Sequence, residues 1–140
     1  MIILDASALY PIAKFVREGA TEAIKQLLEE GVAVLDLTLY EVANAAAIEA
    51  RRGRIRNLEQ VVTAVSKLAK YLTIIRVEPE DLKHISTLGE QLGLTAYDAA
   101  YVHYARLRKA KLLTNDKEIL EKAKDVAIDT GWLRRGLSPK

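Results

Sequence analysis

The chain has 140 residues, half of them hydrophobic, with no cysteine and a formal net charge of +2. This size and composition suit one globular domain, and the lack of cysteine excludes disulfides and thiolate metal sites. The net charge is too small to indicate nucleic-acid binding by itself. No apolar stretch is long enough to span a membrane and no basic leader precedes the first apolar run, so we expect a cytoplasmic protein without a signal peptide.

The beginning of the chain predicts a buried strand that leads into a helix. Residues 2–4 form an unbroken apolar run, which is typical of a strand covered on both faces, and Asp5 ends this run. We expect Ser7 to cap a helix that starts near Ala8, with Pro11 tolerated in its first turn.

The next segments predict another helix, a second strand and a long helix. Apolar residues recur at helical spacing over residues 21–30, and residues 32–35 form a second buried strand. Thr38 and Glu41 match a capping box, which predicts a helix through Ala50 with Glu41 in its first turn.

The second half of the chain continues this alternation. The pattern predicts helices over residues 57–72, 80–91, 95–105 and 117–124, and strands over residues 73–77, 112–114 and 126–128. Asn57 is expected to cap the first of these helices, and Thr95 with Asp98 forms a second capping box. Strands separated by helices predict an α/β fold with a mainly parallel sheet and helices on both faces. We expect one domain over residues 1–130 and a polar tail over residues 131–140.

Four carboxylates are predicted to meet at one edge of this sheet. Asp5 and Asp116 follow strands, whereas Glu41 and Asp98 lie in first turns of helices. Asp98 joins them only if its helix, which precedes a strand, starts at the same edge. Carboxylates about 5 Å apart repel by on the order of 3 kcal/mol at an effective dielectric near 20, so such a cluster sheds charge or binds a cation. An all-oxygen site is typical of Mg²⁺ or Mn²⁺.

Each acid taken alone also has an ordinary structural explanation. Glu41 and Asp98 complete capping boxes, Asp116 suits a helix N-cap, and Asp5 suits a turn. The apolar surroundings of Asp5 and Asp98 favour a shared site, because a buried carboxylate needs a partner and no Lys or Arg is adjacent to either in the sequence.

Four short segments carry these acids. They are Asp-Ala-Ser-Ala at residues 5–8, Glu-Val-Ala-Asn at 41–44, Thr-Ala-Tyr-Asp-Ala-Ala-Tyr at 95–101 and Leu-Thr-Asn-Asp at 113–116. In this order and spacing, over residues 2–124, they resemble the motifs of the PIN-domain nucleases. More narrowly, they resemble the VapC-type toxins of prokaryotic toxin–antitoxin pairs.

The resemblance implies a fold, a site and partners. The implied fold is a parallel five-stranded sheet with the first strand at its centre. The implied metal ligands are Asp5 and Asp98, and the acids completing the pocket directly or through waters are Glu41 and Asp116. The residues implied to orient these acids are Ser7, Asn44 and Thr114. The implied activity is cleavage of single-stranded RNA regions, often in tRNA or rRNA, by a homodimer that a cognate antitoxin inhibits.

We therefore hypothesise an Mg²⁺- or Mn²⁺-dependent endoribonuclease in which a metal-activated water attacks an RNA phosphodiester in line. A group of arginines near the end of the long helix either contacts RNA phosphates or simply faces solvent at a helix end. Its members are Arg51, Arg52, Arg54 and Arg56.

Two other functions remain open. A phosphoacceptor receiver or an acid-dependent phosphatase also has an Asp after its first strand. Such phosphatases, however, have a second Asp where this chain has Ser7, and receivers have a Lys near the position of Thr114. A module that binds RNA or an antitoxin with little or no turnover would use the acids only to organise a surface. Neither His84 nor His103 is at ligand spacing from the four acids, so we expect both to lie outside their site.

Overall fold

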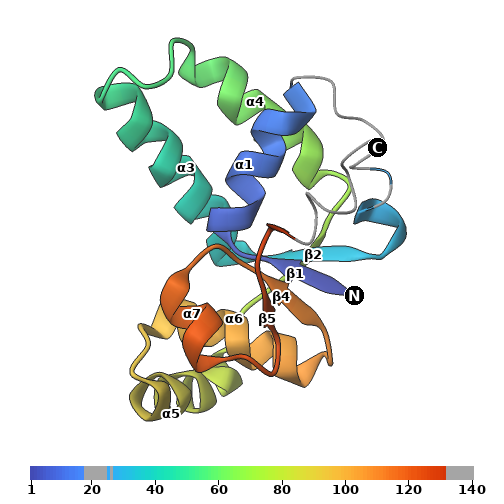
Figure 1. The fold of residues 1–140 in the computed structure, drawn as a ribbon, viewed down its shortest axis with the longest axis vertical. Coiled ribbons are helices and arrows are strands. Elements are labelled where there is room, and N and C mark those ends of the chain that lie inside the picture. Colours follow the sequence, from blue (N-terminus) through green and yellow to red (C-terminus); the bar gives the residue numbers. More distant parts are fainter. Residues whose placement is uncertain (18–24, 26, 132–140) are drawn as a thin grey trace.

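The computed structural model of the chain describes residues 1–17, 25 and 27–131. Its strands are β1 (Ile2–Leu4), β2 (Val32–Leu35), β3 (Thr73–Ile75), β4 (Lys111–Leu113) and β5 (Ala127–Ile128). They form one sheet in the order β3-β2-β1-β4-β5, and all of its pairings are parallel (Figure 1). The predicted α/β fold with a central first strand is therefore confirmed.

Helices cover both faces of this sheet. They are α1 (Ala6–Arg17), α3 (Asp36–Arg51), α4 (Leu58–Ala69), α5 (Leu82–Leu92), α6 (Ala96–Leu107) and α7 (Lys117–Lys122), with a 3₁₀ turn over Pro79–Asp81. Figure 1 shows α1, α3 and α4 on one side of the sheet and α5, α6 and α7 on the other. None of the described helices is both long and apolar enough to cross a membrane.

The first strand shows why the sheet needs cover on both sides. Ile2 and Leu4 belong to the core shared with α1, α3 and α4, whereas Ile3 belongs to the core shared with α5 and α6. Successive side chains of a strand point to opposite faces. An unbroken apolar run is therefore what a strand between two helical layers requires.

The first helix begins earlier than the sequence predicted. It starts at Ala6 rather than near Ala8, so Asp5 precedes it and Asp5 Oδ1 accepts a hydrogen bond from Ala8 N at 3.1 Å. The prediction that Ser7 caps this helix was wrong. Ser7 Oγ instead donates to Asp5 Oδ1 at 2.7 Å, which supports the acid that holds the capping position.

The earlier start also places Pro11 in the second turn of α1. Proline has no N–H, so it cannot make the helical hydrogen bond to Ser7 O, four residues before it. That carbonyl accepts the side-chain amide of Asn115 at 3.0 Å instead. The loop after β4 thus supplies the hydrogen bond that the helix itself cannot make to this carbonyl.

The capping box predicted at Thr38 was also wrong. Helix α3 starts at Asp36, and Thr38 Oγ1 accepts from Leu35 N at 3.0 Å rather than capping the helix itself. Glu41 consequently lies in the second turn of α3. By contrast, the caps predicted at Asn57 and Thr95 are confirmed, although α4 ends slightly earlier than expected.

The predicted helix over residues 21–30 lies largely outside the described residues. The predicted tail over residues 131–140 lies outside them except for residue 131. The domain boundary at residue 130 therefore stays a prediction.

Candidate functional site

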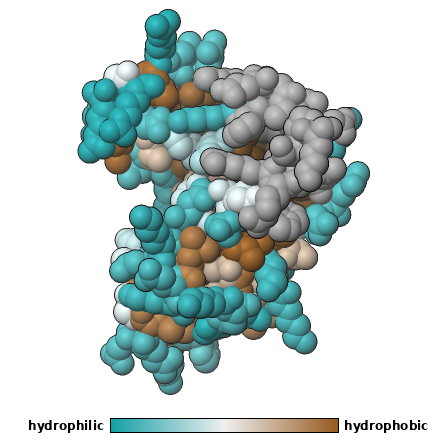
Figure 2. Space-filling model, viewed as in Figure 1, coloured by the Kyte–Doolittle hydropathy of each residue, from teal (hydrophilic) through white to brown (hydrophobic). Residues whose placement is uncertain are grey.

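A pocket of about 330 Å³ opens at the edge of the sheet where several helices begin. It is lined by the starts of α1 and α6, one face of α3 and the residue that caps α7. The lining residues are Asp5, Ala6, Ser7, Glu41, Asn44, Ala45, Ile48, Asp98, Tyr101 and Asp116. In the surface view, the molecule is hollowed between α3 and α7 (Figure 2). All four predicted acids line this one pocket.

Asp5 is the most buried of these acids, with 5% of its surface exposed. Its Oδ1 accepts hydrogen bonds from Ser7 Oγ at 2.7 Å and from Ala8 N at 3.1 Å, and its Oδ2 accepts one from the hydroxyl of Thr114. Burial raises the pKa of Asp5 above its usual range, while these three hydrogen bonds oppose the rise. Ser7 and Thr114, two of the residues predicted to orient the acids, therefore contact Asp5 directly.

The same two hydroxyls also hold the loop after β4. Ser7 Oγ accepts from Asn115 N at 2.8 Å, and Thr114 Oγ1 accepts from Asp116 N at 2.9 Å. These contacts join the start of α1 to the end of β4, so Asp5 and Asp116 face one pocket. Asn115 was not predicted as a supporting residue, although it lies directly before a predicted acid.

Asp116 has both of the roles that the sequence left open. It is the N-cap of α7, because its Oδ1 accepts from Glu118 N at 2.9 Å and from Ile119 N at 3.1 Å. It lines the acidic pocket as well. A capping contact occupies only part of a carboxylate, so one role does not exclude the other.

The group of acidic oxygens that lie closest together in the described part of the chain includes a residue that the sequence analysis missed. Asp98, Asp116 and Glu118 each offer a carboxylate oxygen, and these oxygens all lie within 4.8 Å of one another. Burial raises the pKa of Asp98, and the charge of Asp116 raises it further, with smaller contributions from Asp5 and Glu118. The available signal for Glu118 was its position two residues after Asp116, in the first turn of α7.

Glu41 faces the other acids from α3 and is held by a second residue that was not predicted. Tyr101 OH donates a hydrogen bond to Glu41 Oε1 at 2.6 Å. Burial raises the pKa of Glu41, the bond from Tyr101 opposes this, and the charge of Asp98 raises it again. Burial together with the Glu41 carboxylate raises the pKa of Tyr101, so its hydroxyl stays protonated. The spacing of Tyr101 and Asp98 on one helical face was the signal.

The other predicted residues lie at different distances from the acids. Asn44 lines the pocket but is exposed, and it makes no side-chain hydrogen bond among the described residues. The arginines lie in the last turn of α3 and in the segment after it, exposed and outside the pocket lining. They are Arg51, Arg52, Arg54 and Arg56. The loop that follows α3 projects away from the sheet in Figure 1.

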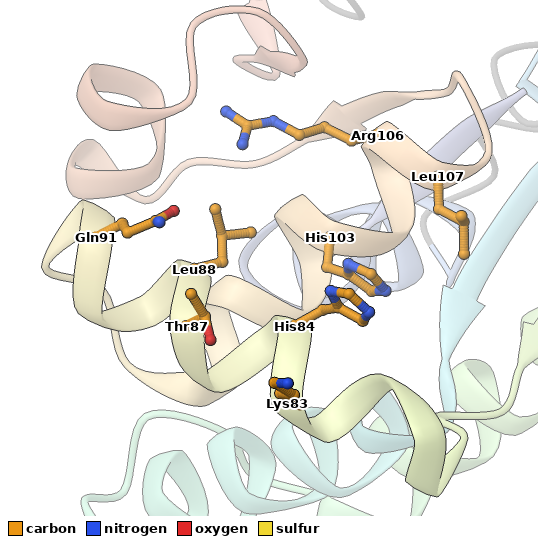
Figure 3. Close-up of a pocket in the computed structure, with 8 residues that line it drawn as sticks. All are labelled: Lys83, His84, Thr87, Leu88, Gln91, His103, Arg106 and Leu107. Atoms are coloured by element: carbon orange, nitrogen blue, oxygen red, sulfur yellow. The ribbon is translucent and has the colours of Figure 1, made fainter.

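A larger hollow of about 570 Å³ between α5 and α6 contains none of these acids (Figure 3). His84 and His103 stack there with ring centroids 5.9 Å apart, and His103 Nε2 lies 3.4 Å from Asp81 Oδ1. As the sequence predicts, neither histidine lines the acidic pocket. The two come together only because α5 packs against α6.

The donors of the acidic pocket fit a hard divalent cation. Carboxylate oxygens dominate, and in the described part of the chain none of the four predicted acids forms an ion pair with Lys, Arg or His. Glu118 alone has a basic neighbour, Lys122 at 3.6 Å. Opposite ligands of Mg²⁺ are about 4.2 Å apart, so oxygens within 4.8 Å of one another need only small movements to share one ion.

Comparisons with known proteins agree with this geometry. The PIN domain family matches residues 2–125. Exonuclease VapC9 from Pyrobaculum aerophilum is 38% identical over 132 residues, which cover 94% of this chain and 91% of that protein. Ribonuclease VapC3 from the same organism is 34% identical over 125 residues, or 86% and 93% of the two chains. The crystal structure of PAE2754 from Pyrobaculum aerophilum superposes with a TM-score of 0.78 at 32% identity, covering 97% of this chain and 95% of that one. The chain therefore belongs to the PIN-domain family and, within it, to the VapC-type proteins.

Proposed function

We propose that the chain is an Mg²⁺- or Mn²⁺-dependent endoribonuclease that cleaves single-stranded RNA and serves as the toxin of a VapBC-type pair. The observation that carries this proposal is the gathering of Asp5, Glu41, Asp98 and Asp116 in one pocket. Carboxylates without basic partners among the described residues favour a cation there. The relatives named exonuclease and ribonuclease support action on a nucleic acid.

The acids divide into two groups around the pocket. Among the described residues, Asp98, Asp116 and Glu118 offer the closest set of oxygens for a cation, and Asp5 and Glu41 line the acidic pocket together with Asp98 and Asp116. When bound, the cation supplies positive charge opposite the scissile phosphate and increases the acidity of a neighbouring water. The protein's own part is to hold these oxygens in place and to accept a proton.

Glu41 is the best placed of the acids to accept that proton. Its Oε1 is occupied by Tyr101, whereas Oε2 has no hydrogen-bond partner among the described residues. Burial raises the pKa of this carboxylate in the metal-free protein, so Glu41 binds a proton more readily there than an exposed glutamate does. Asp5 has both oxygens engaged by Ser7, Ala8 and Thr114, which suits a fixed structural acid better than a proton carrier.

The proposed substrate and partners follow from the same family relationship. The exposed arginines at the end of α3 are suited to phosphate contacts, because Lys and Arg dominate binding to the nucleic-acid backbone. Membership among the VapC-type proteins supports a cognate antitoxin and a homodimer as the working assembly. An RNA substrate would place the activity in the cytoplasm.

The test uses the full chain stripped of metal with EDTA and two RNAs without base pairing, one linear and one circular. We expect both to be cut only after Mg²⁺ or Mn²⁺ is restored, since a circular RNA has no end for an exonuclease. Asp98→Asn should abolish cleavage, and Asp125→Asn, which removes an exposed carboxylate paired with Arg106, should not. Cleavage without metal, or undiminished cleavage by Asp98→Asn, would contradict the proposal.

A phosphoacceptor role for Asp5 has less support. A receiver needs a carboxylate oxygen open to attack a phosphodonor, and both oxygens of Asp5 already accept hydrogen bonds. Thr114 also stands where a receiver would have a Lys. Incubation with a small phosphodonor should therefore yield no base-labile acyl phosphate.

A further inference from the structure

The position of Glu41 depends on a residue from another helix. Glu41 projects from the second turn of α3, and Tyr101 projects from α6 with only 1% of its surface exposed. Tyr101 OH donates to Glu41 Oε1 at 2.6 Å. Water has almost no access to the tyrosine, so a water molecule cannot readily take the place of Glu41 as the partner of this hydroxyl.

The direction of the hydrogen bonds behind Tyr101 is set by the backbone. Thr38 Oγ1 accepts from Leu35 N at 3.0 Å and lies 2.7 Å from Tyr101 OH. Tyr101 has one proton and donates it to the Glu41 carboxylate, so Thr38 must donate to Tyr101. A directed series of bonds therefore runs from the end of β2 through Thr38 and Tyr101 to Glu41.

This series opposes an electrostatic force on Glu41. Asp98 and Asp5 are both close enough for their charges to interact unfavourably with that of Glu41. A glutamate has several rotatable bonds, so without an anchor this repulsion would favour rotamers that carry the carboxylate toward solvent. A hydrogen bond to an ionised carboxylate is among the stronger kinds, and here both the donor and its support are buried.

We propose that Tyr101, oriented by Thr38, is a positioning residue that holds Glu41 in the pocket. Glu41 Oε2 can then bind a water molecule of the cation and accept a proton from it. This inference rests on the proposed nuclease function. It gives the hydroxyl of Tyr101 a role beyond packing. The aromatic ring is sufficient to fill the core, whereas the hydroxyl contacts the acid.

The same helix contains a matched control. Tyr104 is also buried, with 2% of its surface exposed, and its hydroxyl also donates to a carboxylate, Asp81 Oδ2 at 2.7 Å. It accepts from Glu78 N at 3.0 Å as well, and it does not line the acidic pocket. Removing either hydroxyl removes a hydrogen bond that a buried tyrosine donates to a carboxylate, but only the loss at Tyr101 should weaken binding at the cation site.

The decisive measurement is Mn²⁺ affinity by calorimetry on metal-free protein, combined with a double-mutant cycle. We expect Tyr101→Phe to weaken Mn²⁺ binding by about tenfold or more, as for other residues that orient metal ligands. Tyr104→Phe should leave the affinity unchanged. In a Glu41→Ala background, Tyr101→Phe should have no further effect. Wild-type affinity in Tyr101→Phe, or an equal loss in both backgrounds, would overturn the inference.

A second pair of variants protects the test against a poorly folded Tyr101→Phe protein. Thr38→Ser keeps a hydroxyl next to Tyr101 and should bind Mn²⁺ as wild type does, whereas Thr38→Ala should bind it more weakly. Equal affinities in this pair would also count against the inference. A wild-type protein that neither binds Mn²⁺ nor cleaves RNA would overturn the proposed function itself. Wild-type binding and cleavage with no effect of Tyr101→Phe would overturn only the role of Tyr101.

Discussion

Thr114 donates a hydrogen bond to Asp5 Oδ2, although the two residues are 109 positions apart in the sequence. They meet because β1 and β4 pair in parallel with Leu4 opposite Leu113, which places the next residue of each strand at the same edge. The bond therefore depends on the register of the sheet, and the most buried acid of the pocket depends on the bond.

Thr114→Val should destabilise the fold and weaken the proposed activity. The substitution keeps the shape of the side chain but removes the donor to Asp5 and the acceptor for Asp116 N. Leaving buried polar groups unpaired costs about 1–3 kcal/mol, and we expect a loss of that size in urea unfolding. Thr73→Val is the control, because Thr73 is exposed on the edge strand β3. Equal stabilities of the two variants would contradict this account of Thr114.

Asp98→Asn should stabilise the metal-free protein at neutral pH. The pKa of Asp98 is raised in the folded state above its ordinary value of 3.8, so the charged form carries a penalty on folding. This penalty is absent below the unfolded pKa, grows as the pH rises through the folded pKa and is complete above it. The excess in Tm of the variant over wild type, measured in EDTA, should therefore increase from acidic to neutral pH.

Asp98→Asn also acts on Glu41, because the charge of Asp98 is one cause of the raised pKa of Glu41. Removing that charge lowers the cost of ionising Glu41, so it adds to the expected gain of the variant in the same direction of pH. Two other acids do not affect the comparison. Asp81 and Asp125 have lowered pKa values, so their contributions to stability are lost at still lower pH. Both groups are present in wild type and variant and cancel in the difference. A difference in Tm that is constant across the pH range would argue against a strained carboxylate at Asp98.

Added Mg²⁺ or Mn²⁺ should raise the Tm of the wild-type protein. A ligand that binds only the folded state stabilises by about 2.7 kcal/mol at 100 times its Kd. Glu118→Gln should reduce this gain, because Glu118 shares the closest group of oxygens with Asp98 and Asp116. Glu121→Gln, on the same short helix but outside that group, should show the full gain. The prediction for Glu118 fails if both variants respond alike.

Asn115→Ala should cost about 0.5–1.5 kcal/mol of stability, because its amide supplies the hydrogen bond to Ser7 O that Pro11 cannot make. In a Pro11→Ala background, the N–H of residue 11 becomes available to that carbonyl. We therefore expect the cost of Asn115→Ala, measured by chemical denaturation, to shrink in that background. Equal costs in both backgrounds would show that the amide and the proline are not coupled.

The local sequence pattern mispredicted the starts of two helices, because contacts with distant residues help to decide which side chain caps each helix. The Thr-x-x-Glu pattern from Thr38 is compatible with Thr38 as a cap and also with Thr38 inside the first turn, two positions after Asp36. Two contacts place Thr38 inside the first turn. Its hydroxyl accepts a hydrogen bond from Leu35 N, which is local, and donates one to Tyr101 OH, which is distant in the sequence. At the start of α1, Asp5 rather than Ser7 occupies the capping position, and the Asp5 carboxylate accepts a hydrogen bond from Thr114, which follows β4.

The sequence by itself determined the layered α/β fold and the acids that follow β1 and β4, because burial on two faces demands unbroken apolar runs and a polar residue ends each run. Only the tertiary structure decided that Tyr101 would hold Glu41 and that Glu118 would join Asp98 and Asp116. Strand register and helix packing bring these groups together. Both depend on the whole core, which no short stretch of sequence describes.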